Sequence, residues 1–355
     1  MNKQPVQILY LFIILAVVPI LVSTVTQAQD TMQIPDFRVI YAASAFGNVE
    51  DNTDIFLLDT VDMMPINLTN NSAEDIFPAV SVDGTQIAFL SNRSGQYEIY
   101  VMDSDGSNVV QLTEESKPNL ASVTWSADGT TIAFSSFRDA NFEIYSIDIE
   151  NNVLNRLTNN TVNDFEPTWS PQTHSLAFVS DGNIAIMDPD SGDTSIVYSG
   201  SGDNKDLAWS SDGNKIAFAS YTLNPDETSY DAEIYIIEIE TENLVQLTDN
   251  LVDDASPSWS RDGNYLTFVS NAGEAQNDFE IMLANPEDGE ILSITSNLSN
   301  ERCPILSSDG TVVLFVSDRG APFETNDIYA IQLEEMVLSQ ITASFSNERC
   351  PLSWG

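Results

Sequence analysis

The stretch Val123–Asp148, VTWSADGTTIAFSSFRDANFEIYSID, contains three segments with the length and composition of short β-strands. Between the first two lies the pair Asp128-Gly129, which supplies the positive φ angles of a tight hairpin turn. An Asn-rich bend after the third segment leads to Val153–Thr158, VLNRLT, which completes the set. These residues predict a four-stranded antiparallel module with strands of about three to six residues.

Two markers of this module recur along the chain. The Trp-Ser pair that ends the first strand, or a variant of it, occurs seven times, and the Leu-Thr pair of the fourth strand recurs at steps of 40 to 50 residues. A period of this size is typical of propeller blades. The first-strand markers are Val80-Ser81, Trp125-Ser126, Trp169-Ser170, Trp209-Ser210, Trp259-Ser260, Leu306-Ser307 and Ser353-Trp354, and the fourth-strand markers begin at Leu68, Leu112, Leu157, Val197, Leu247, Ile294 and Ile341.

The two ends of the repeat array complement each other. The array begins with second, third and fourth strands at Phe37–Ser44, Asp54–Asp59 and Pro65–Thr69, and it ends with a single first strand at Pro351–Trp354. Pairing these ends in one blade would close the ring and remove its exposed sheet edges. The sequence therefore predicts an all-β fold, a single seven-bladed β-propeller domain over residues 37–355.

The repeated phrase resembles the TolB-type β-propeller repeat, a relative of the WD-type repeats. The resemblance rests on Pro257–Gly263 (PSWSRDG), Ile87–Phe89 (IAF) and Glu98–Asp103 (EIYVMD), and it covers nearly all of the chain after the first 36 residues. TolB proteins are expected to join an α/β domain to a six-bladed propeller. Six blades is therefore the alternative count, and this chain leaves no room for the first domain.

The N-terminal segment has the features of a secretory signal peptide. Met1–Gln7 contains one lysine, Ile8–Val22 is almost entirely apolar, and Thr26 and Ala28 are small residues at the expected cleavage positions. We therefore predict a signal peptide over residues 1–28, secretion or a periplasmic location, and no stable membrane insertion after cleavage. An uncleaved anchor is the alternative, although the apolar run is shorter than the ~20 residues of a spanning helix.

The charge balance is strongly acidic. The chain has 12 Lys and Arg against 54 Asp and Glu, a formal net charge of −42. Because phosphate binding requires a basic surface, this composition excludes nucleic acid as a partner. It favours solubility as a monomer, and it favours attraction of divalent cations or basic protein segments.

Acidic side chains also recur at one repeat position, three residues before the proline of the first strand. If this position lies at a mouth of the central channel, its carboxylates form a ring that could bind a basic partner or Ca²⁺ through oxygen ligands. The alternative is that each acid caps its own turn by accepting backbone N–H groups. The residues are Asp75, Asp164, Asp254, Glu301 and Glu348.

A near-duplicated phrase, SNERCP, contains both cysteines of the chain. Cys303 and Cys350 occupy the same repeat position in blades that closure makes adjacent, and an exported protein favours a disulfide between them. Beside them, Arg302 and Arg349 are expected to neutralise Glu301 and Glu348, or to form a cationic sector of the channel mouth for a carboxylate or sugar-acid ligand.

The sequence favours a binding protein over an enzyme. His174 is the only histidine, it lies where other blades have the Asp-Gly turn, and no G-x-S-x-G motif is present. Propeller lyases of related repeat type hold their metal with several histidines, which this chain lacks. We predict a non-catalytic protein-interaction scaffold of the cell envelope without an obligatory cofactor. The alternative is a carbohydrate- or small-ligand-binding protein, or a hydrolase or lyase, that uses channel carboxylates and Ca²⁺.

Overall fold

The computed structural model describes residues 37–44, 52–114, 120–137, 140–200, 202–223, 230–272, 278–319, 326–342 and 352–354. Residues 34–355 form one compact unit, and this unit contains all of the described residues. The predicted signal peptide, residues 1–28, lies outside the described part of the chain. Within that part, no helix long and apolar enough to cross a membrane occurs.

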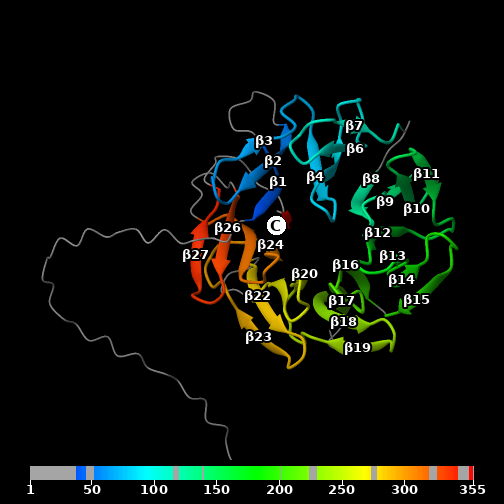
Figure 1. Cartoon of the computed structure of the whole chain (residues 1–355). Coiled ribbons are helices and arrows are strands. Elements are labelled where there is room, and N and C mark those ends of the chain that lie inside the picture. The colour runs from blue at the N-terminus through cyan, green and yellow to red at the C-terminus, as the bar shows by residue number, and fades with distance from the viewer. Residues whose placement is uncertain are drawn as a thin grey trace, which may run out of the picture. The chain divides into compact units, whose positions relative to one another are not determined.

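Seven four-stranded antiparallel sheets are arranged around a common centre, which confirms the predicted seven-bladed propeller (Figure 1). We name the blades A to G in chain order. Blade A contains β28 (Leu352–Trp354), β1 (Arg38–Ser44), β2 (Thr53–Asp59) and β3 (Ile66–Asn67), and blade B contains β4 (Asp75–Val80), β5 (Gln86–Ser91), β6 (Glu98–Asp103) and β7 (Val110–Gln111). Blade C contains β8 (Leu120–Trp125), β9 (Thr131–Phe137), β10 (Phe142–Asp148) and β11 (Val153–Arg156).

The other four blades repeat this order. Blade D contains β12 (Asp164–Trp169), β13 (Leu176–Ser180), β14 (Asn183–Met187) and β15 (Thr194–Tyr198), and blade E contains β16 (Asp203–Trp209), β17 (Lys215–Leu223), β18 (Tyr230–Glu238) and β19 (Asn243–Gln246). Blade F contains β20 (Asp254–Trp259), β21 (Leu266–Ser270), β22 (Glu280–Asn285) and β23 (Glu290–Ser293), and blade G contains β24 (Glu301–Leu306), β25 (Val312–Ser317), β26 (Asp327–Gln332) and β27 (Val337–Gln340).

The ring closes as the sequence predicts. The C-terminal strand β28 pairs antiparallel with β1, with Arg38 opposite Trp354 and Ile40 opposite Leu352. Blade A is therefore built from both ends of the propeller. This pairing covers the edge of β1 that would otherwise be open to another chain.

The hydrophobic core lies between neighbouring blades, because the middle strands bury both faces. In blades B to G, the second strand contributes a fully buried phenylalanine. Four of these rings stack on the tyrosine of the third strand, as in Phe89 with Tyr100 at 5.8 Å between centroids. Such pairs stabilise by about 0.5–1.5 kcal/mol beyond their burial. The buried phenylalanines are Phe89, Phe134, Phe178, Phe218, Phe268 and Phe315.

The Asp-Gly turns form as the sequence predicts. In blade C, the Ser126 hydroxyl donates to Asp128 Oδ1 at 2.6 Å, and the Thr130 N–H donates to the same oxygen at 3.1 Å. Gly129 has a φ of +70°, which an L residue rarely adopts. In blade D, where His174 replaces this pattern, the half-exposed imidazole lies 3.7 Å from Asp190 and packs against Trp169.

The first-strand tryptophans also connect consecutive blades. Trp125 Nε1 donates to the Ala79 carbonyl of the preceding blade at 2.9 Å, and Trp209 and Trp259 make the equivalent bonds at 3.1 Å. Trp169 is as buried as Trp125, at 6% exposed, but its Nε1 has no hydrogen-bond partner among the described residues.

Because Trp125 and Trp169 are equally buried and differ in this hydrogen bond, substituting each of them by phenylalanine measures what the bond contributes. Trp125→Phe loses an inter-blade hydrogen bond and leaves the Ala79 carbonyl without its donor, whereas Trp169→Phe removes a donor that has no partner. We expect Trp125→Phe to lower the free energy of unfolding by about 1 kcal/mol more than Trp169→Phe, measured by denaturant unfolding. Equal losses in the two variants would show that the indole bond contributes nothing.

Candidate functional site

The innermost strands share a bulge two residues after the repeated acidic position. The register between the first and second strand shifts there, and the bulge residue has a φ near +50° in blades B to G. A bulge of this kind bends the strand and takes one residue out of the hydrogen-bond ladder. The residues are Phe77, Ser122, Glu166, Asp206, Ser256 and Cys303.

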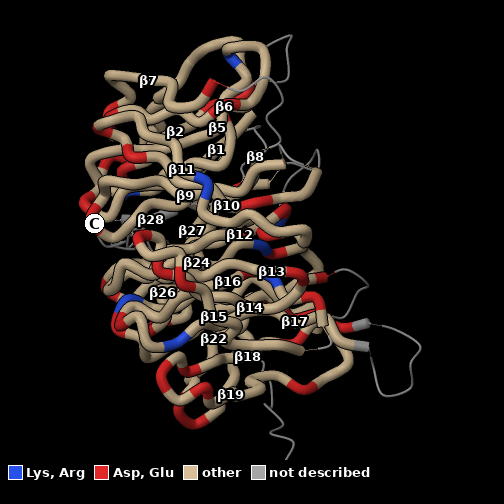
Figure 2. Tube along the Cα trace, turned by 90° about the vertical axis from the view of Figure 1, so that its right-hand side faces the viewer, with Lys and Arg blue, Asp and Glu red and all other residues tan. Residues whose placement is uncertain are grey.

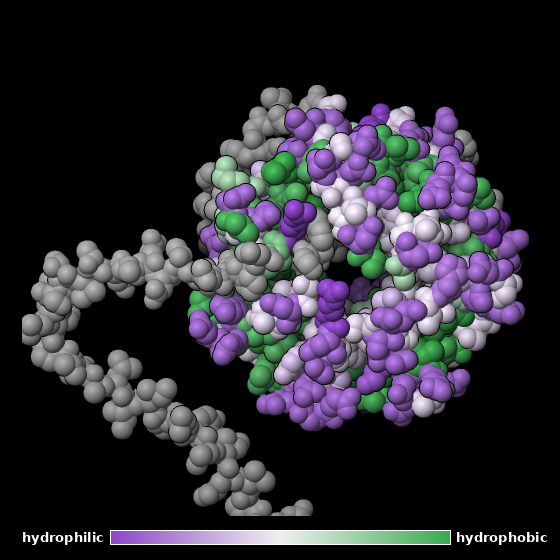
Figure 3. Space-filling view, in the orientation of Figure 1, coloured by the Kyte–Doolittle hydropathy of each residue, from purple (hydrophilic) through white to green (hydrophobic). Residues whose placement is uncertain are grey.

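Three of these bulge residues link their blades around the channel. The Asp206 N–H donates to Glu166 Oε2 at 2.9 Å, and the Ser256 N–H donates to Asp206 Oδ2 at 3.0 Å. Each bond joins the innermost strands of adjacent blades. Figure 3 shows the hollow at the centre of the ring that these strands surround, with hydrophilic residues over much of its border. We call Phe77, Ser122, Glu166, Asp206, Ser256 and Cys303 the channel ring.

Several charged side chains lie close together on the innermost strands of blades D and E. Burial, followed by repulsion from Asp206, raises the pKa of the Glu166 carboxyl. Lys205 Nζ lies 3.0 Å from Asp203 and 5.0 Å from the centre of the Tyr221 ring, and the bond to Asp203 raises the pKa of the lysine. Burial raises the pKa of Tyr221 as well. This part of the channel therefore places a carboxyl of raised pKa beside a lysine.

The structure places the described members of the predicted carboxylate ring away from solvent. Each is 0% exposed and lies at the start of an innermost strand, where it accepts a bond from the asparagine four residues earlier. That asparagine in turn caps the connection, as Asn160 Oδ1 does for the Val162 N–H at 2.8 Å. The pairs are Asn71 with Asp75 (2.7 Å), Asn160 with Asp164 (2.6 Å), Asn250 with Asp254 (2.7 Å) and Asn297 with Glu301 (3.2 Å).

These acids therefore position the strands behind the channel surface. They accept asparagine amides rather than the backbone N–H groups of their own turns. The fifth predicted acid, Glu348, lies outside the described residues together with Arg349 and Cys350. Arg302 is exposed.

A second series of buried acids was not predicted from the sequence. These acids lie at or near the start of the third strand in six blades. The residue after each acid donates its N–H to the threonine of the Leu-Thr marker, as in Ile144 to Thr158 at 2.8 Å. The repeated E-I-Y phrase in the sequence could have indicated these acids, because in each copy the acid stands next to the apolar residues of a buried strand. The acids are Asp54, Glu98, Glu143, Glu233, Glu280 and Asp327.

The two acidic series meet at several blade junctions, and an arginine pairs with one acid at three of these junctions. Arg93 lies 3.0 Å from Asp75, Arg156 lies 3.0 Å from Glu143, and Arg319 lies 2.5 Å from Glu301. At the junction of blades E and F, burial raises the pKa of Glu233 to about 7 and also raises that of Asp254. That carboxylate pair therefore retains a proton under mildly acidic conditions. Figure 2 shows how far Asp and Glu outnumber Lys and Arg along the chain.

The cysteine of the channel ring is in a disulfide. Cys303 is disulfide-bonded, and Cys350, the other cysteine of the sequence, lies outside the described residues.

With the blades and channel defined, comparison with known proteins identifies the repeat. The family model described as the TolB beta propeller domain matches residues 35–134, 116–224 and 181–349. The chain belongs to the TolB β-propeller domain family. A protein TolB homolog of Chlorobium chlorochromatii is 30% identical over 146 residues, which make up 39% of this chain and 32% of that protein. The match thus spans about a third of that relative.

Two solved structures are similar to the propeller. TolB of Acinetobacter baumannii has a TM-score of 0.59 at 17% identity, over 89% of this chain and 66% of that one. An oligogalacturonate lyase of Vibrio parahaemolyticus has a TM-score of 0.62 at 12% identity, over 85% of each chain. At these identities the likeness shows the fold alone, since one fold supports unrelated activities.

The raised pKa of Glu233 predicts a pH dependence of stability. Because the folded-state pKa lies above the ordinary value of 4.5, the stability from protonated Glu233 is complete below about pH 4.5 and is lost as the pH rises through about 7. Glu233→Gln should therefore match the wild type near pH 4.5 and exceed its free energy of unfolding at pH 8 by roughly 1–3 kcal/mol. Glu240→Gln, at an exposed turn, is the control. A difference that does not change with pH would contradict this assignment.

The predicted bridge between Cys303 and Cys350 is tested separately. Without reductant, the intact protein should have a mass about 2 Da below that of the dithiol form, because the bond forms with loss of two hydrogens. Replacing both cysteines by serine should lower the free energy of unfolding by roughly 4 kcal/mol, the chain-entropy value for a loop of about 48 residues. Two free thiols in the purified protein would disprove the bridge.

Proposed function

We propose that this chain is an exported, non-catalytic binding protein of the cell envelope whose acidic channel receives a basic segment of a protein partner. The charged sector of the channel ring carries the proposal. Glu166 and Asp206 are held on adjacent blades by inter-blade hydrogen bonds, so the partner would meet carboxylates in fixed positions. Binding to such a preorganised surface loses little conformational entropy.

The charge and shape of the channel support this proposal. A net charge of −42 attracts cationic groups, and a cleft lined by one sign of charge concentrates the field inside it. Phe77, another member of the channel ring, has 58% of its surface exposed. A channel ring that contains both an exposed aromatic side chain and fixed carboxylates suits a segment that combines Lys or Arg with an apolar residue. Membership of the TolB β-propeller domain family is consistent with an envelope location.

The partner site is tested by comparing two doubly neutralised variants in a pull-down from envelope extract. Glu166→Gln with Asp206→Asn removes two charges from the channel and retains the oxygen acceptors of the inter-blade bonds. Glu150→Gln with Glu240→Gln removes two charges from exposed turns. We expect the channel variant to capture the partner several-fold less than the wild type, and the turn variant to capture it equally.

The dependence of capture on salt concentration is a second test of the contact between the channel and its partner. Capture by the wild type should fall as ionic strength rises, because exposed charges are screened. Equal capture by both variants would move the partner site away from the channel. If the wild type captures no protein, the interaction proposal fails.

The second candidate function is binding of a small ligand, including its turnover. The observation that favours it is the grouping of Glu166, Lys205 and Tyr221 in one part of the channel, where a carboxyl of raised pKa and a cation suit a sugar acid. Calorimetric titration with acidic oligosaccharides would distinguish this function, since a protein-interaction scaffold gives no heat with them.

A further inference from the structure

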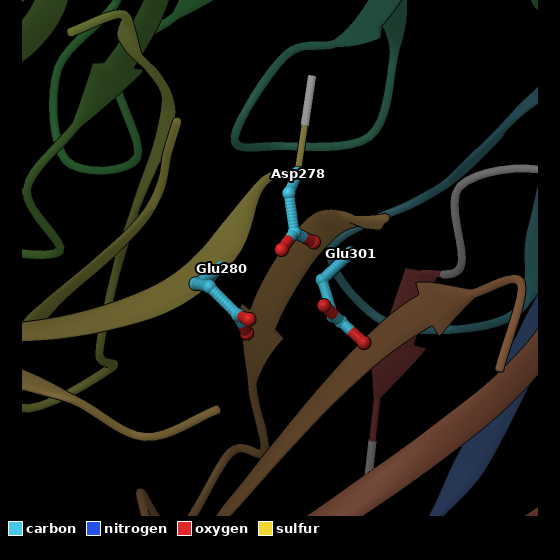
Figure 4. A group of neighbouring side chains, drawn as sticks. All are labelled: Asp278, Glu280 and Glu301. Carbon is cyan, nitrogen blue, oxygen red and sulfur yellow. The ribbon is translucent and has the colours of Figure 1, made fainter. Parts of the chain in front are cut away.

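Three carboxylates converge at the junction of blades F and G. Asp278 precedes β22, Glu280 opens β22, and Glu301 opens β24, the innermost strand of the next blade. Figure 4 shows their side chains pointing toward one another. One oxygen from each lies within 4.8 Å of the other two. This spacing suits a single ion contacted by all three.

The second observation is a buried carboxylate without a partner. Asp278 is only 2% exposed, and neither of its oxygens has a hydrogen-bond partner among the described residues. Glu301 Oε2 is buried and unpartnered in the same way. Leaving a buried charged oxygen without a donor or cation is costly, so a positive group between these atoms would stabilise them.

The protein's own donors are committed elsewhere in the cluster. Arg319 Nη2 contacts Glu301 Oε1 at 2.5 Å, and the Ser317 hydroxyl donates to the same oxygen at 2.8 Å. The Asn297 N–H donates to Glu280 Oε1 at 2.5 Å. Three carboxylates and one guanidinium leave two negative charges, which matches a divalent cation.

In blade C, an asparagine stands at the position that Asp278 has in blade F. Two residues before Glu143, where blade F has Asp278, blade C has Asn141. The Asn141 amide donates to Glu143 Oε1 at 2.9 Å, and Arg156 Nη2 contacts the same oxygen at 3.0 Å. The change from Asn to Asp in blade F replaces a donor with an acceptor, and neither oxygen of this acceptor has a hydrogen-bond partner among the described residues.

A cavity adjoins one member of the cluster. Its volume is about 330 Å³, and its lining includes Glu280 and Asn297, with Ser296 and Ala272 beside them. The Glu280 side of the cluster therefore borders an open space.

We propose that Asp278, Glu280 and Glu301 bind one Ca²⁺ ion, which joins the third strand of blade F to the innermost strand of blade G. An all-carboxylate set selects a hard cation. Ca²⁺ fits better than Mg²⁺ because Mg²⁺ gives up its water reluctantly and requires near-ideal octahedral geometry, whereas Ca²⁺ accepts irregular oxygen ligands. The proposal does not depend on the partner site in the channel.

The site is tested by titrating CaCl₂ into the EDTA-treated, dialysed protein in a calorimeter. The wild type should bind one equivalent, and Asp278→Asn should bind at least tenfold more weakly. Asp231→Asn is the matched control, because Asp231 has the equivalent position in blade E, and it should retain wild-type affinity. No binding by the wild type, undiminished binding by Asp278→Asn, or an equal loss in Asp231→Asn would overturn the assignment.

Thermal unfolding separates loss of the ion from loss of the fold. In metal-free buffer, Asp278→Asn should melt above the wild type, because it removes repulsion between buried carboxylates. Added Ca²⁺ should raise the melting temperature of the wild type and leave that of Asp278→Asn unchanged. A larger response of the wild type to Mg²⁺ than to Ca²⁺ would overturn the choice of ion.

Discussion

The closed ring depends on the pairing of β28 with β1. Among the described residues three pairs make this contact, and it completes blade A and covers the sheet edge of β1. All other inner strands are joined to their own blades by tight turns. Cys303, in a disulfide on the innermost strand of blade G, adds a covalent constraint beside this seam. Closure therefore relies on few contacts, and the chain reinforces it where it is weakest.

Buried carboxylates are the second organising feature of the ring. At four of the described blade junctions, an acid near the start of a third strand lies toward the acid that opens the next innermost strand, and both acids are buried. The junctions solve this problem differently. Arg93 pairs with Asp75 and Arg156 with Glu143, and the raised pKa of Glu233 favours a retained proton at its junction. At the junction of blades F and G, Asp278 lies close to Glu280 and Glu301 and has no hydrogen-bond partner among the described residues. Part of the negative charge of the chain thus lies on buried carboxylates between blades. The packing of the blades therefore depends on the pH and on the cations in solution.

The sequence correctly predicted the repeated strands and turns. It did not predict the position of the acidic residues, because an acid can either face the channel or be buried behind it. The Trp-Ser and Leu-Thr markers predicted seven blades and their closure, because strand periodicity and Asp-Gly turns are local signals. The acids three residues before the first-strand proline were predicted to surround a channel mouth. Their burial depends on Asn160 and its equivalents, and an asparagine in a polar connection has no distinctive pattern. The channel ring was missed because its members share a backbone conformation and no common side chain.

That shared conformation has a consequence for how the channel can change. Every described member of the channel ring adopts a left-handed backbone, which costs a residue with a Cβ atom roughly 1–2 kcal/mol, and none of them is glycine. The propeller thus accepts local strain at six positions and has a side chain at each, from Phe77 through Glu166 to Cys303. Since these residues stand outside the ladder and the inter-blade core, their chemistry can vary while the scaffold stays the same. Substitutions in the channel ring can therefore change which ligand the channel binds, while the fold of the blades stays the same.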